Sequence, residues 1–136
     1  MRRFLLGVLV AGVAAAVLAW PRINDVETGK TPEYPDLQVR TYPGDVARVA
    51  KAAQRAVEHL PRWSFLGAGQ GPGGAEVRAN HKNLWQVQDE VTVRVRAGAK
   101  GTAVSVRSRS GAFRWDFGQN ARNIRELLAE LDREVR

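Results

Sequence analysis

Two runs of alternating residues, joined by a short glycine-containing segment, constrain the fold of this chain more than any other feature. Stretches 88–96 and 102–109 carry valines at alternate positions, and two of the five residues between them, in stretch 97–101, are glycine. Successive side chains of a strand point to opposite faces of a sheet, so the pattern predicts a hairpin with one buried face. The side chains expected on that face are Val91, Val93, Val95, Val104 and Val106.

Two other stretches have apolar residues at helical spacing. The first follows Asp45, a residue suited to cap a helix, and ends before Pro61, which cannot continue one. The second begins at about Gln119 and runs towards the C-terminus. The positions expected to be buried are Val46, Val49, Ala50, Ala53, Val57 and Leu60 in the first helix, and Ala121, Ile124, Leu127, Leu128, Leu131 and Val135 in the second.

Shorter runs complete the predicted sheet. Stretches 62–66 and 75–79 predict two strands, with the glycine-rich stretch 67–74 as a flexible hairpin tip, and a short strand is expected near Leu37 to Tyr42. We therefore predict an α+β fold with a single antiparallel sheet of four to five strands. Two helices pack on one face of this sheet, and an N-terminal hydrophobic helix precedes it.

The N-terminus has the pattern of a membrane signal. Arg2 and Arg3 precede an apolar run from Phe4 to Trp20, whose seventeen residues reach the short end of the roughly 17–25 needed to span a bilayer. The positive charges favour an N-terminus inside and a domain on the periplasmic or outer side of the cytoplasmic membrane. Trp20 favours an uncleaved anchor, whereas small residues before it fit the alternative, a secreted protein whose signal peptide is cleaved.

Prolines mark the next segment, which contains Pro21, Pro32, Pro35 and Pro43. Each restricts its own backbone and that of the preceding residue to extended geometry. We divide the chain into a membrane anchor or signal peptide at 1–20, a Pro-rich extended arm with a short strand at 21–44, and a globular α+β domain at 45–136.

The composition narrows the classes of partner. With 21 Lys and Arg against 14 Asp and Glu, the net charge is +7. A basic exported domain suits anionic lipid or an envelope polymer, and export argues against nucleic acid. The absence of cysteine excludes disulfides, thiolate metal sites and a cysteine nucleophile. A protein partner is left undefined.

The polar side of the predicted hairpin is the first candidate binding site. Like charges opposite each other on paired strands are destabilising unless an anion neutralises them, and arginine suits phosphate or carboxylate. In the competing interpretation, Glu76, Asp89 and Glu90 neutralise a solvated face. The arginines on this side are Arg94, Arg96, Arg107 and Arg109.

Asp116 and Asn120, at the junction of the last strand and the last helix, are the second candidate. Together with Arg107 or Arg109 they would form an Asp/Arg/Asn cluster. The spacing from Asp116 to Gln119 also fits a capping box, so either Asp116 or Asn120 is a candidate for the helix start. The neighbouring aromatic residues are expected to close the core; these are Phe113, Trp115 and Phe117, with Trp63 and Trp85.

Few features favour catalysis. The two histidines, His59 and His81, have no metal-ligand companion at helical or turn spacing, and His59 suits the last turn of a helix. No serine has the context of a nucleophile elbow, and no phosphate-binding loop is present. We predict no cofactor and no metal, and we lean against an enzyme.

Several short motifs occur in a defined order. They are Asn24-Asp25-Val26 with Thr28, Pro32-Glu33-Tyr34, Leu60-Pro61-Arg62-Trp63, Asp89–Val95, Val106–Ser110, and Asp116–Arg122 with Ile124-Arg125. Together they cover most of residues 23–131 and resemble the domain of unknown function 1499 family, small bacterial proteins that are often membrane-attached. The sequence departs from that family's pattern around Gly111 to Trp115. The resemblance implies a grouping and no activity.

These observations favour a membrane-anchored, exported accessory or binding domain that recognises an anionic envelope ligand through its arginine-rich sheet face. The residues assigned to this ligand site are Arg94, Arg96, Arg107, Arg109, Asp116 and Asn120. One alternative is a small hydrolase-like enzyme with an Asp/Arg/Asn site. The other is a structural interaction protein whose partner contacts the Pro-rich arm.

Overall fold

The computed structural model of the protein describes residues 20–136. The predicted N-terminal hydrophobic helix, and the anchor or signal peptide to which it belongs, lie outside the described residues except for Trp20. Within residues 20–136, neither helix combines the length and the apolar character that a membrane crossing requires.

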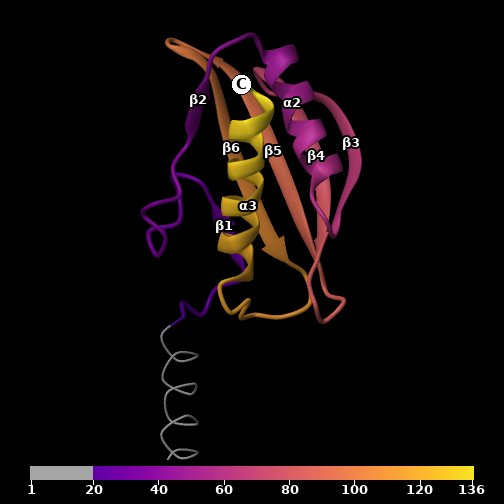
Figure 1. Cartoon of the computed structure of the whole chain (residues 1–136). Coiled ribbons are helices and arrows are strands. Elements are labelled where there is room, and N and C mark those ends of the chain that lie inside the picture. The colour runs from indigo at the N-terminus through magenta and orange to yellow at the C-terminus, as the bar shows by residue number, and fades with distance from the viewer. Residues whose placement is uncertain (1–19) are drawn as a thin grey trace, which may run out of the picture.

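The described residues form one six-stranded antiparallel sheet and two helices (Figure 1). The strands are β1 (Asp25–Glu27), β2 (Arg40–Tyr42), β3 (Trp63–Gly71), β4 (Gly74–Lys82), β5 (Gln88–Gly98) and β6 (Gly101–Ser110). The helices are α2 (Val46–His59) and α3 (Gln119–Glu134). The strand order is β1-β6-β5-β4-β3, and β2 also pairs with β6. The predicted α+β class is confirmed.

The prediction of four to five strands is wrong, because β1 adds a sixth. This strand has three residues in a segment interrupted by prolines, too short to show alternation in the sequence. It forms because the edge of β6 is long enough for two partners: β1 pairs with residues 107–109 and β2 with residues 102–104. Residues 21–44, predicted as an extended arm, thus contribute two strands to the sheet.

Further contacts hold this segment against the sheet and α3. Val26 and Leu37 are buried, and the hydroxyl of Thr28 accepts a hydrogen bond from the backbone of Val106 (3.0 Å). The guanidinium of Arg125 donates two hydrogen bonds to Asp36, at 2.9 and 3.1 Å. These contacts attach the segment to the sheet and to α3 at several points along its length.

Both helices lie on the same face of the sheet, as predicted (Figure 1). Asp45 caps α2 by accepting a hydrogen bond from the backbone N–H of Arg48 at 2.8 Å. Three alanines of α2 are almost completely buried, which allows the helix to lie close to β3, β4 and β5; these are Ala52, Ala53 and Ala56. The five valines predicted on the buried face of the hairpin are all fully buried beneath the helices.

The glycine-rich stretch 67–74 is not the flexible tip that its composition suggests. Strand β3 continues through Gly71, after a register shift between Phe65 and Gly67, and the turn to β4 is confined to Pro72 and Gly73. Gly73 has a φ of 74°, a left-handed conformation that glycine adopts without steric strain. Pairing with the long strand β4 decides the structure here, because composition alone does not specify a partner.

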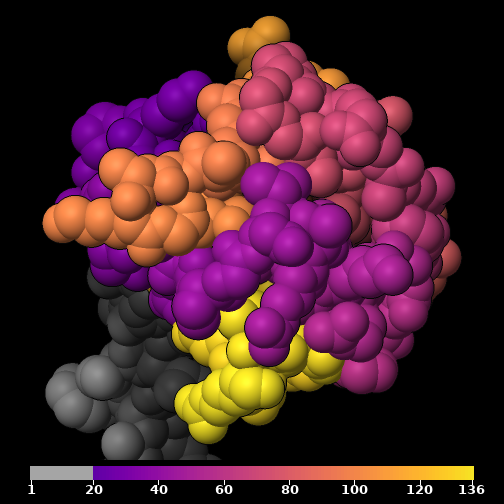
Figure 2. Space-filling model, turned by 90° about the horizontal axis from the view of Figure 1, so that it is seen from above, coloured from indigo at the N-terminus to yellow at the C-terminus, as the bar shows by residue number. Residues whose placement is uncertain are grey.

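The two ends of the domain differ in construction. Figure 2 looks onto the end that carries the β3–β4 and β5–β6 hairpins, the start of α2 and the C-terminus of α3. The opposite end, at the bottom of Figure 1, is made of residues 20–24, the β4–β5 connection (83–87) and the β6–α3 connection (111–118). We call this second end the loop end.

Candidate functional site

The outer face of the sheet, turned away from the helices, carries the arginines of the first candidate site. Arg94, Arg107 and Arg109 lie on this face, and Arg96 follows near the β5–β6 hairpin. Their positions alternate with buried residues along both strands. Strand periodicity therefore brings the four arginines to one face.

Carboxylates on the same face pair with most of these arginines. Hydrogen bonds from Arg107 hold the pKa of Asp25 below its ordinary value. Four carboxylates thus pair with four arginines of this face, Arg78 among them, and Arg96 is left without a carboxylate partner among the described residues. The pairs are Arg107 with Asp25 (2.5 and 2.9 Å), Arg94 with Glu27 (3.3 Å) and Glu76 (3.9 Å), Arg109 with Glu90 (3.3 Å), and Arg78 with Glu90 (3.7 Å).

The set of acidic partners differs in part from the predicted one. Glu76 and Glu90 pair with arginines as expected, whereas Asp89 is 1% exposed and lies on the helix side of the sheet. Adjacent residues of a strand point to opposite faces, so Asp89 and Glu90 cannot share one. Asp25 and Glu27 come from β1, the strand that the sequence did not reveal.

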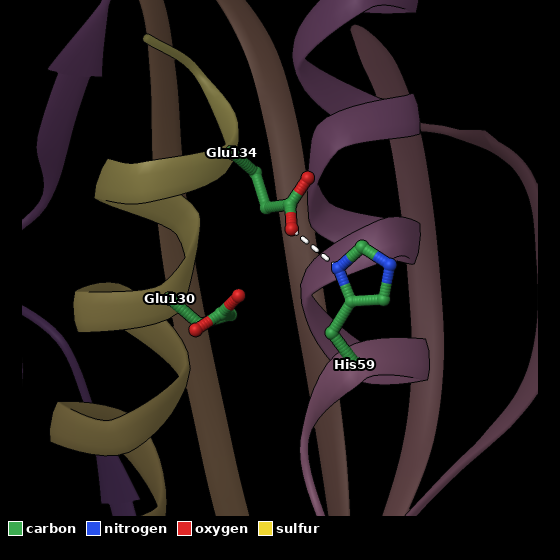
Figure 3. Close-up of side chains that lie close together, drawn as sticks. All are labelled: His59, Glu130 and Glu134. Atoms are coloured by element: carbon green, nitrogen blue, oxygen red, sulfur yellow. Dashed lines mark hydrogen bonds and ion pairs between the residues drawn. The ribbon is translucent and has the colours of Figure 1, made fainter.

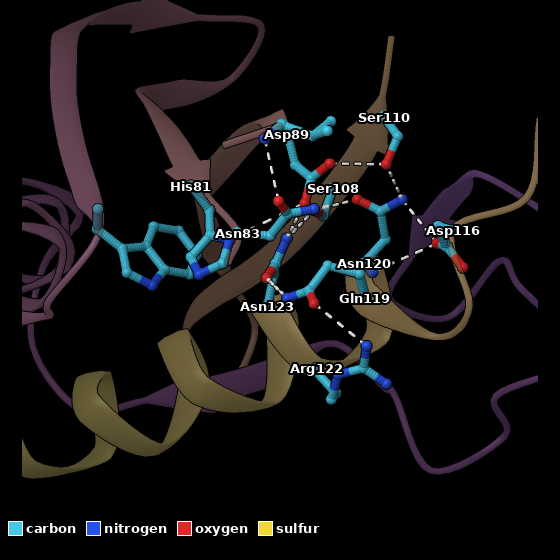
Figure 4. A network of polar contacts seen from close by, with 12 residues as sticks. His81, Asn83, Asp89, Ser108, Ser110, Asp116, Gln119, Asn120, Arg122 and Asn123 are labelled. Atoms are coloured by element: carbon cyan, nitrogen blue, oxygen red, sulfur yellow. Dashed lines mark hydrogen bonds and ion pairs between the residues drawn. The ribbon is translucent and has the colours of Figure 1, made fainter. Parts of the chain in front are cut away.

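A network of buried polar side chains lies on the helix side, where β5 begins, β6 ends and α3 begins (Figure 4). Asp89 accepts hydrogen bonds from Ser110 (2.7 Å) and Asn123 (2.9 Å). Asn120, fully buried, accepts one from Ser108 (2.7 Å) and donates to Ser110 (3.0 Å). Polar groups buried in this way are stable because each has its partners within the network.

Asp116 joins the network and organises the start of α3. One carboxylate oxygen accepts a hydrogen bond from the backbone N–H of Gly118 at 2.8 Å. The other accepts from the side chain of Asn120 at 2.7 Å and from its backbone N–H at 3.3 Å. Gly118, directly before the helix, has a φ of 78°. Of the two residues considered for the helix start, Asp116 binds the backbone, and Asn120 turns towards the sheet.

The structure does not bring Asp116 and Asn120 together with Arg107 and Arg109. The two arginines pair with carboxylates on the outer face, whereas Asp116 and Asn120 are buried on the helix side. The physical reason is again the alternation of side chains along a strand, which sends Ser108 and Ser110 to one side and Arg107 and Arg109 to the other. The predicted six-residue site is therefore two separate groups.

The serine, carboxylate and histidine of the network are not connected in the order found in a catalytic serine site. The Ser110 hydroxyl donates to one oxygen of Asp89 at 2.7 Å, and His81 Nδ1 lies 3.9 Å from the other oxygen. The carboxylate thus separates the hydroxyl from the imidazole. A serine nucleophile is activated by a base that contacts its own hydroxyl, normally a histidine. This geometry supports a structural role for the network.

Next to the network, a cleft opens at the loop end between the 83–87 and 111–118 connections. It consists of two adjoining hollows of about 420 and 360 Å³ that share Asn83, Trp85, Gln119 and Arg122 in their walls. We call it the loop-end cleft. The larger hollow is also lined by Val87, Ser110, Phe113, Trp115, Asp116 and Phe117, and the smaller by Arg62, His81, Leu84 and Glu126.

Each hollow has in its wall a side chain with an unpartnered buried nitrogen. Trp115 Nε1 in the larger hollow and His81 Nδ1 in the smaller have no hydrogen-bond partner among the described residues. Leaving such groups unpaired is costly, and native structures rarely do so without a reason. Arg122 adds a cation to the shared wall. The walls of the cleft therefore combine aromatic side chains with one cation and with two residues whose buried nitrogens lack a hydrogen-bond partner.

The expectation that five aromatic residues close the core is correct only for Trp63, which is 8% exposed. Trp85 is 84%, Phe113 61% and Phe117 43% exposed, and Trp115 is partly buried. The reason is their position beyond the last residues of β4 and β6, where neither helix covers them. Alternation read from the sequence could not show that the sheet ends at Ser110.

The model of a family described as protein of unknown function (DUF1499) matches residues 17–131. The chain belongs to this family. The match includes the six strands, α2 and most of α3, and thus both connections that form the loop-end cleft. No protein with a curated description matches the chain.

In this DUF1499 protein a group of side chains of the types that bind metal ions lies between the helices (Figure 3). His59, at the end of α2, contacts Glu134 of α3 at 2.5 Å, and Glu130 lies one helical turn before Glu134. Two arginines compete for the carboxylates: Arg55 pairs with Glu134 at 3.1 Å, and Arg133 pairs with Glu130. The hydrogen bond from His59, aided by Arg55, lowers the pKa of Glu134. Contacts of Glu134 with Arg55 and His59 across the two helices, and of Glu130 with Arg133 within α3, account for this cluster.

Sequence reasoning missed four members of the buried network: Asp89, Ser108, Ser110 and Asn123. The alternation of the strands and the helical spacing of α3 do contain a signal for these residues. Asp89 and Ser108 are in phase with the buried valines of their strands, and Asn120 and Asn123 fall on the buried side of α3. A polar residue at a position that periodicity assigns to the core is a reason to expect a buried network.

Proposed function

We propose that this DUF1499 protein is a membrane-anchored, exported binding domain that takes an anionic amphiphile in its loop-end cleft. The observation that carries the proposal is the cleft itself, with aromatic walls and unpartnered buried nitrogens above a fully bonded polar floor. The anchoring rests on Arg2, Arg3 and the apolar run that ends at Trp20.

The available polar groups favour a ligand that accepts hydrogen bonds. An indole N–H such as that of Trp115 can only donate, and the guanidinium of Arg122 carries a positive charge and donates as well. Three further aromatic side chains, Trp85, Phe113 and Phe117, line the larger hollow together with Val87 and the polar residues Asn83, Ser110, Asp116 and Gln119. Ligand sites commonly combine an apolar wall with a few polar groups that fix orientation. A phosphate or carboxylate joined to an apolar group fits both features.

The floor supports binding more than reaction. Both oxygens of Asp89 and both oxygens of Asp116 accept hydrogen bonds from within the network. A general base needs an oxygen that reaches the proton to be removed. These carboxylates hold β5, β6 and α3 together, which keeps the walls of the cleft in place.

The outer sheet face is less suited to an anionic ligand. An anion that binds Arg107 there competes with Asp25, which accepts two hydrogen bonds from the same guanidinium. Arg122, by contrast, donates to a backbone carbonyl at 3.0 Å and an amide oxygen at 3.2 Å, both neutral. The cation with neutral partners is therefore the better anion receptor.

The four tryptophans allow a direct test. The full chain, labelled with ¹⁵N at tryptophan and reconstituted in phosphatidylcholine nanodiscs, is titrated with the short-chain lipid dihexanoylphosphatidic acid while the indole N–H signals are followed by NMR. We expect a saturable shift of the Trp115 signal. The Trp63 indole lines neither hollow and donates to Glu126 at 2.8 Å, and its signal should shift several-fold less than that of Trp115.

Two variants identify the group that binds the anion. Arg122→Ala is expected to weaken the apparent affinity about tenfold, the consequence of losing one charge-assisted hydrogen bond of roughly 1.4 kcal/mol. The matched variant Arg107→Ala removes the same side chain from the outer face and leaves the affinity unchanged. A Trp115 signal that does not move, or an equal loss in both variants, contradicts the proposed cleft.

A further inference from the structure

Most of the large apolar side chains exposed in this protein gather at the loop end. Seven are exposed among residues 20–136, and five of these belong to residues 20–24, 83–87 and 111–118. The remaining two, Val39 and Leu66, lie elsewhere on the surface. The five are Trp20 (38%), Leu84 (72%), Trp85 (84%), Phe113 (61%) and Phe117 (43%).

Aromatic contacts join part of this group into one surface with the beginning of the described chain. The rings of Trp115 and Phe117 stack with their centroids 4.6 Å apart. The Trp20 ring meets the edge of Phe117 at 6.1 Å. The residue that ends the apolar run Phe4–Trp20 is therefore packed on the aromatic surface of the loop end.

The arginines at this end differ from those of the outer sheet face. Among the described residues, Arg22, Arg114 and, in the first turn of α3, Arg122 have no carboxylate within ion-pair distance. On the outer face Arg94 has two such partners and Arg107 and Arg109 have one each, whereas Arg96, near the β5–β6 hairpin, has none. Arg22 lies over the Trp115 ring at 5.1 Å, and Arg122 over the Trp20 ring at 5.8 Å. The loop end thus presents uncompensated positive charge beside exposed aromatic rings.

We propose that the loop end is a bilayer-docking surface that rests in the headgroup region of a membrane containing anionic lipid. Tryptophan is favoured at the boundary between water and hydrocarbon, and arginine extends its charge to phosphates while its stem stays in apolar surroundings. A bilayer is the occupant that fits, because the apolar run preceding Trp20 leads into this same surface.

Docking in this orientation gives the cleft a source of ligand. The loop-end cleft shares Trp85, Phe113 and Phe117 with the docking surface, so it opens towards the lipid. Its anionic amphiphile is then a lipid of the bilayer. This consequence, and the anchoring, rest on the proposed function, whereas docking of the loop end is measured without reference to the cleft.

The absence of cysteine makes the orientation measurable in the full chain. Single cysteines are introduced at the loop end by Leu84→Cys or Ala112→Cys, and at the opposite hairpins by Pro72→Cys or Ala99→Cys. Each carries a spin label, and the chain is reconstituted in vesicles of phosphatidylcholine and phosphatidylglycerol. We expect labels at 84 and 112 to be several-fold less accessible to a water-soluble nickel complex than labels at 72 and 99.

Matched variants distinguish two explanations of membrane contact. In one, the apolar side chains and arginines of the loop end bind the bilayer; in the other, the N-terminal segment alone keeps the domain near it. Trp85→Ala with Phe113→Ala, or Arg22→Ala with Arg114→Ala, should restore much of the nickel accessibility of a label at 112. The controls Val39→Ala with Leu66→Ala, and Arg107→Ala with Arg109→Ala, remove equivalent side chains elsewhere and should have no effect.

Equal nickel accessibility at all four labelled positions overturns the docking proposal. So does an equal effect of the loop-end variants and their controls. Either result leaves the proposed cleft standing if dihexanoylphosphatidic acid still shifts the Trp115 signal. Shielded labels without that shift would retain the docking surface and remove the cleft.

Discussion

At the scale of single residues, Asn120 is the most connected member of the buried network. Its side chain bonds to Ser108, Ser110, Asp116 and the backbone of Asn24. Asn120→Ala leaves several of these groups buried without a partner, and we expect the free energy of unfolding to fall by about 2–4 kcal/mol. Urea unfolding of the full chain in non-ionic detergent, followed by far-UV circular dichroism, measures the loss.

A matched asparagine provides the control for this prediction. Asn80 makes one hydrogen bond, to Gln88 at 3.3 Å, at an exposed site. Asn80→Ala should change the free energy of unfolding by no more than about 0.5 kcal/mol. Similar losses for the two variants would mean that the network contributes little to stability.

The ion pair of Asp25 and Arg107 makes the free energy of unfolding depend on pH. Hydrogen bonds from Arg107 lower the pKa of Asp25 in the folded protein. The pair therefore stabilises the fold above the unfolded pKa of about 4, and this contribution is lost as the pH falls through the lower folded pKa. Because both side chains are partly exposed, we expect the pair to contribute less than about 1 kcal/mol to the free energy of unfolding.

Urea unfolding at a series of pH values tests the sign and the source of this effect. The native chain should lose more stability than Asp25→Asn when the pH is lowered from about 5 to about 2. In an Arg107→Ala background, Asp25→Asn should make no further difference to the slope. Parallel pH profiles for the native chain and Asp25→Asn would show that the pair does not contribute.

At the scale of elements, two glycines on neighbouring strands have opposite roles. A Cβ on Gly74, at the start of β4, would lie 1.9 Å from the carbonyl oxygen of Val95. Gly74→Ala must therefore push β4 away from β5, and we expect a loss of about 2–3 kcal/mol. A Cβ on Gly69, in β3, meets nothing within 4 Å. Gly69→Ala should leave the stability unchanged or raise it by about 0.5 kcal/mol.

Thermal unfolding of the two glycine variants distinguishes close backbone approach from a general requirement for glycine in the stretch 67–74. The expected order of midpoints is Gly69→Ala at or above the native chain and Gly74→Ala well below it. Comparable losses in both would show that flexibility of the stretch, and not the approach of β5, is what the sequence preserves.

The elements themselves were predicted to different degrees, for physical reasons. Helix α2 begins directly after Asp45 and ends before Pro61, because a capping side chain and a proline act locally. Strands β5 and β6 were evident because alternation over many residues reports one buried face. Strand β1 was not, since three residues carry no period and the strand depends on the free edge of β6.

At the scale of the whole molecule, the sheet and the helix layer determine which surface remains free to bind a ligand or a membrane. Helices cover one face of the sheet, and acidic side chains neutralise most of the arginines on the other. The loop end is left as the place where aromatic rings and unpaired arginines meet, beside the end of the apolar N-terminal run. The binding and docking proposals both follow from that distribution.

Residue order alone predicts the α+β class, the two helices, the central hairpin and the faces on which its valines and arginines lie, because periodicity and capping are local properties. Which charges meet is a property of the tertiary structure. It placed Asp25 and Glu27 beside the arginines through an unpredicted strand, and separated Asp116 and Asn120 from Arg107 and Arg109 by the thickness of the sheet. It also left Trp85, Phe113 and Phe117 exposed, because burial depends on where the sheet and helices end.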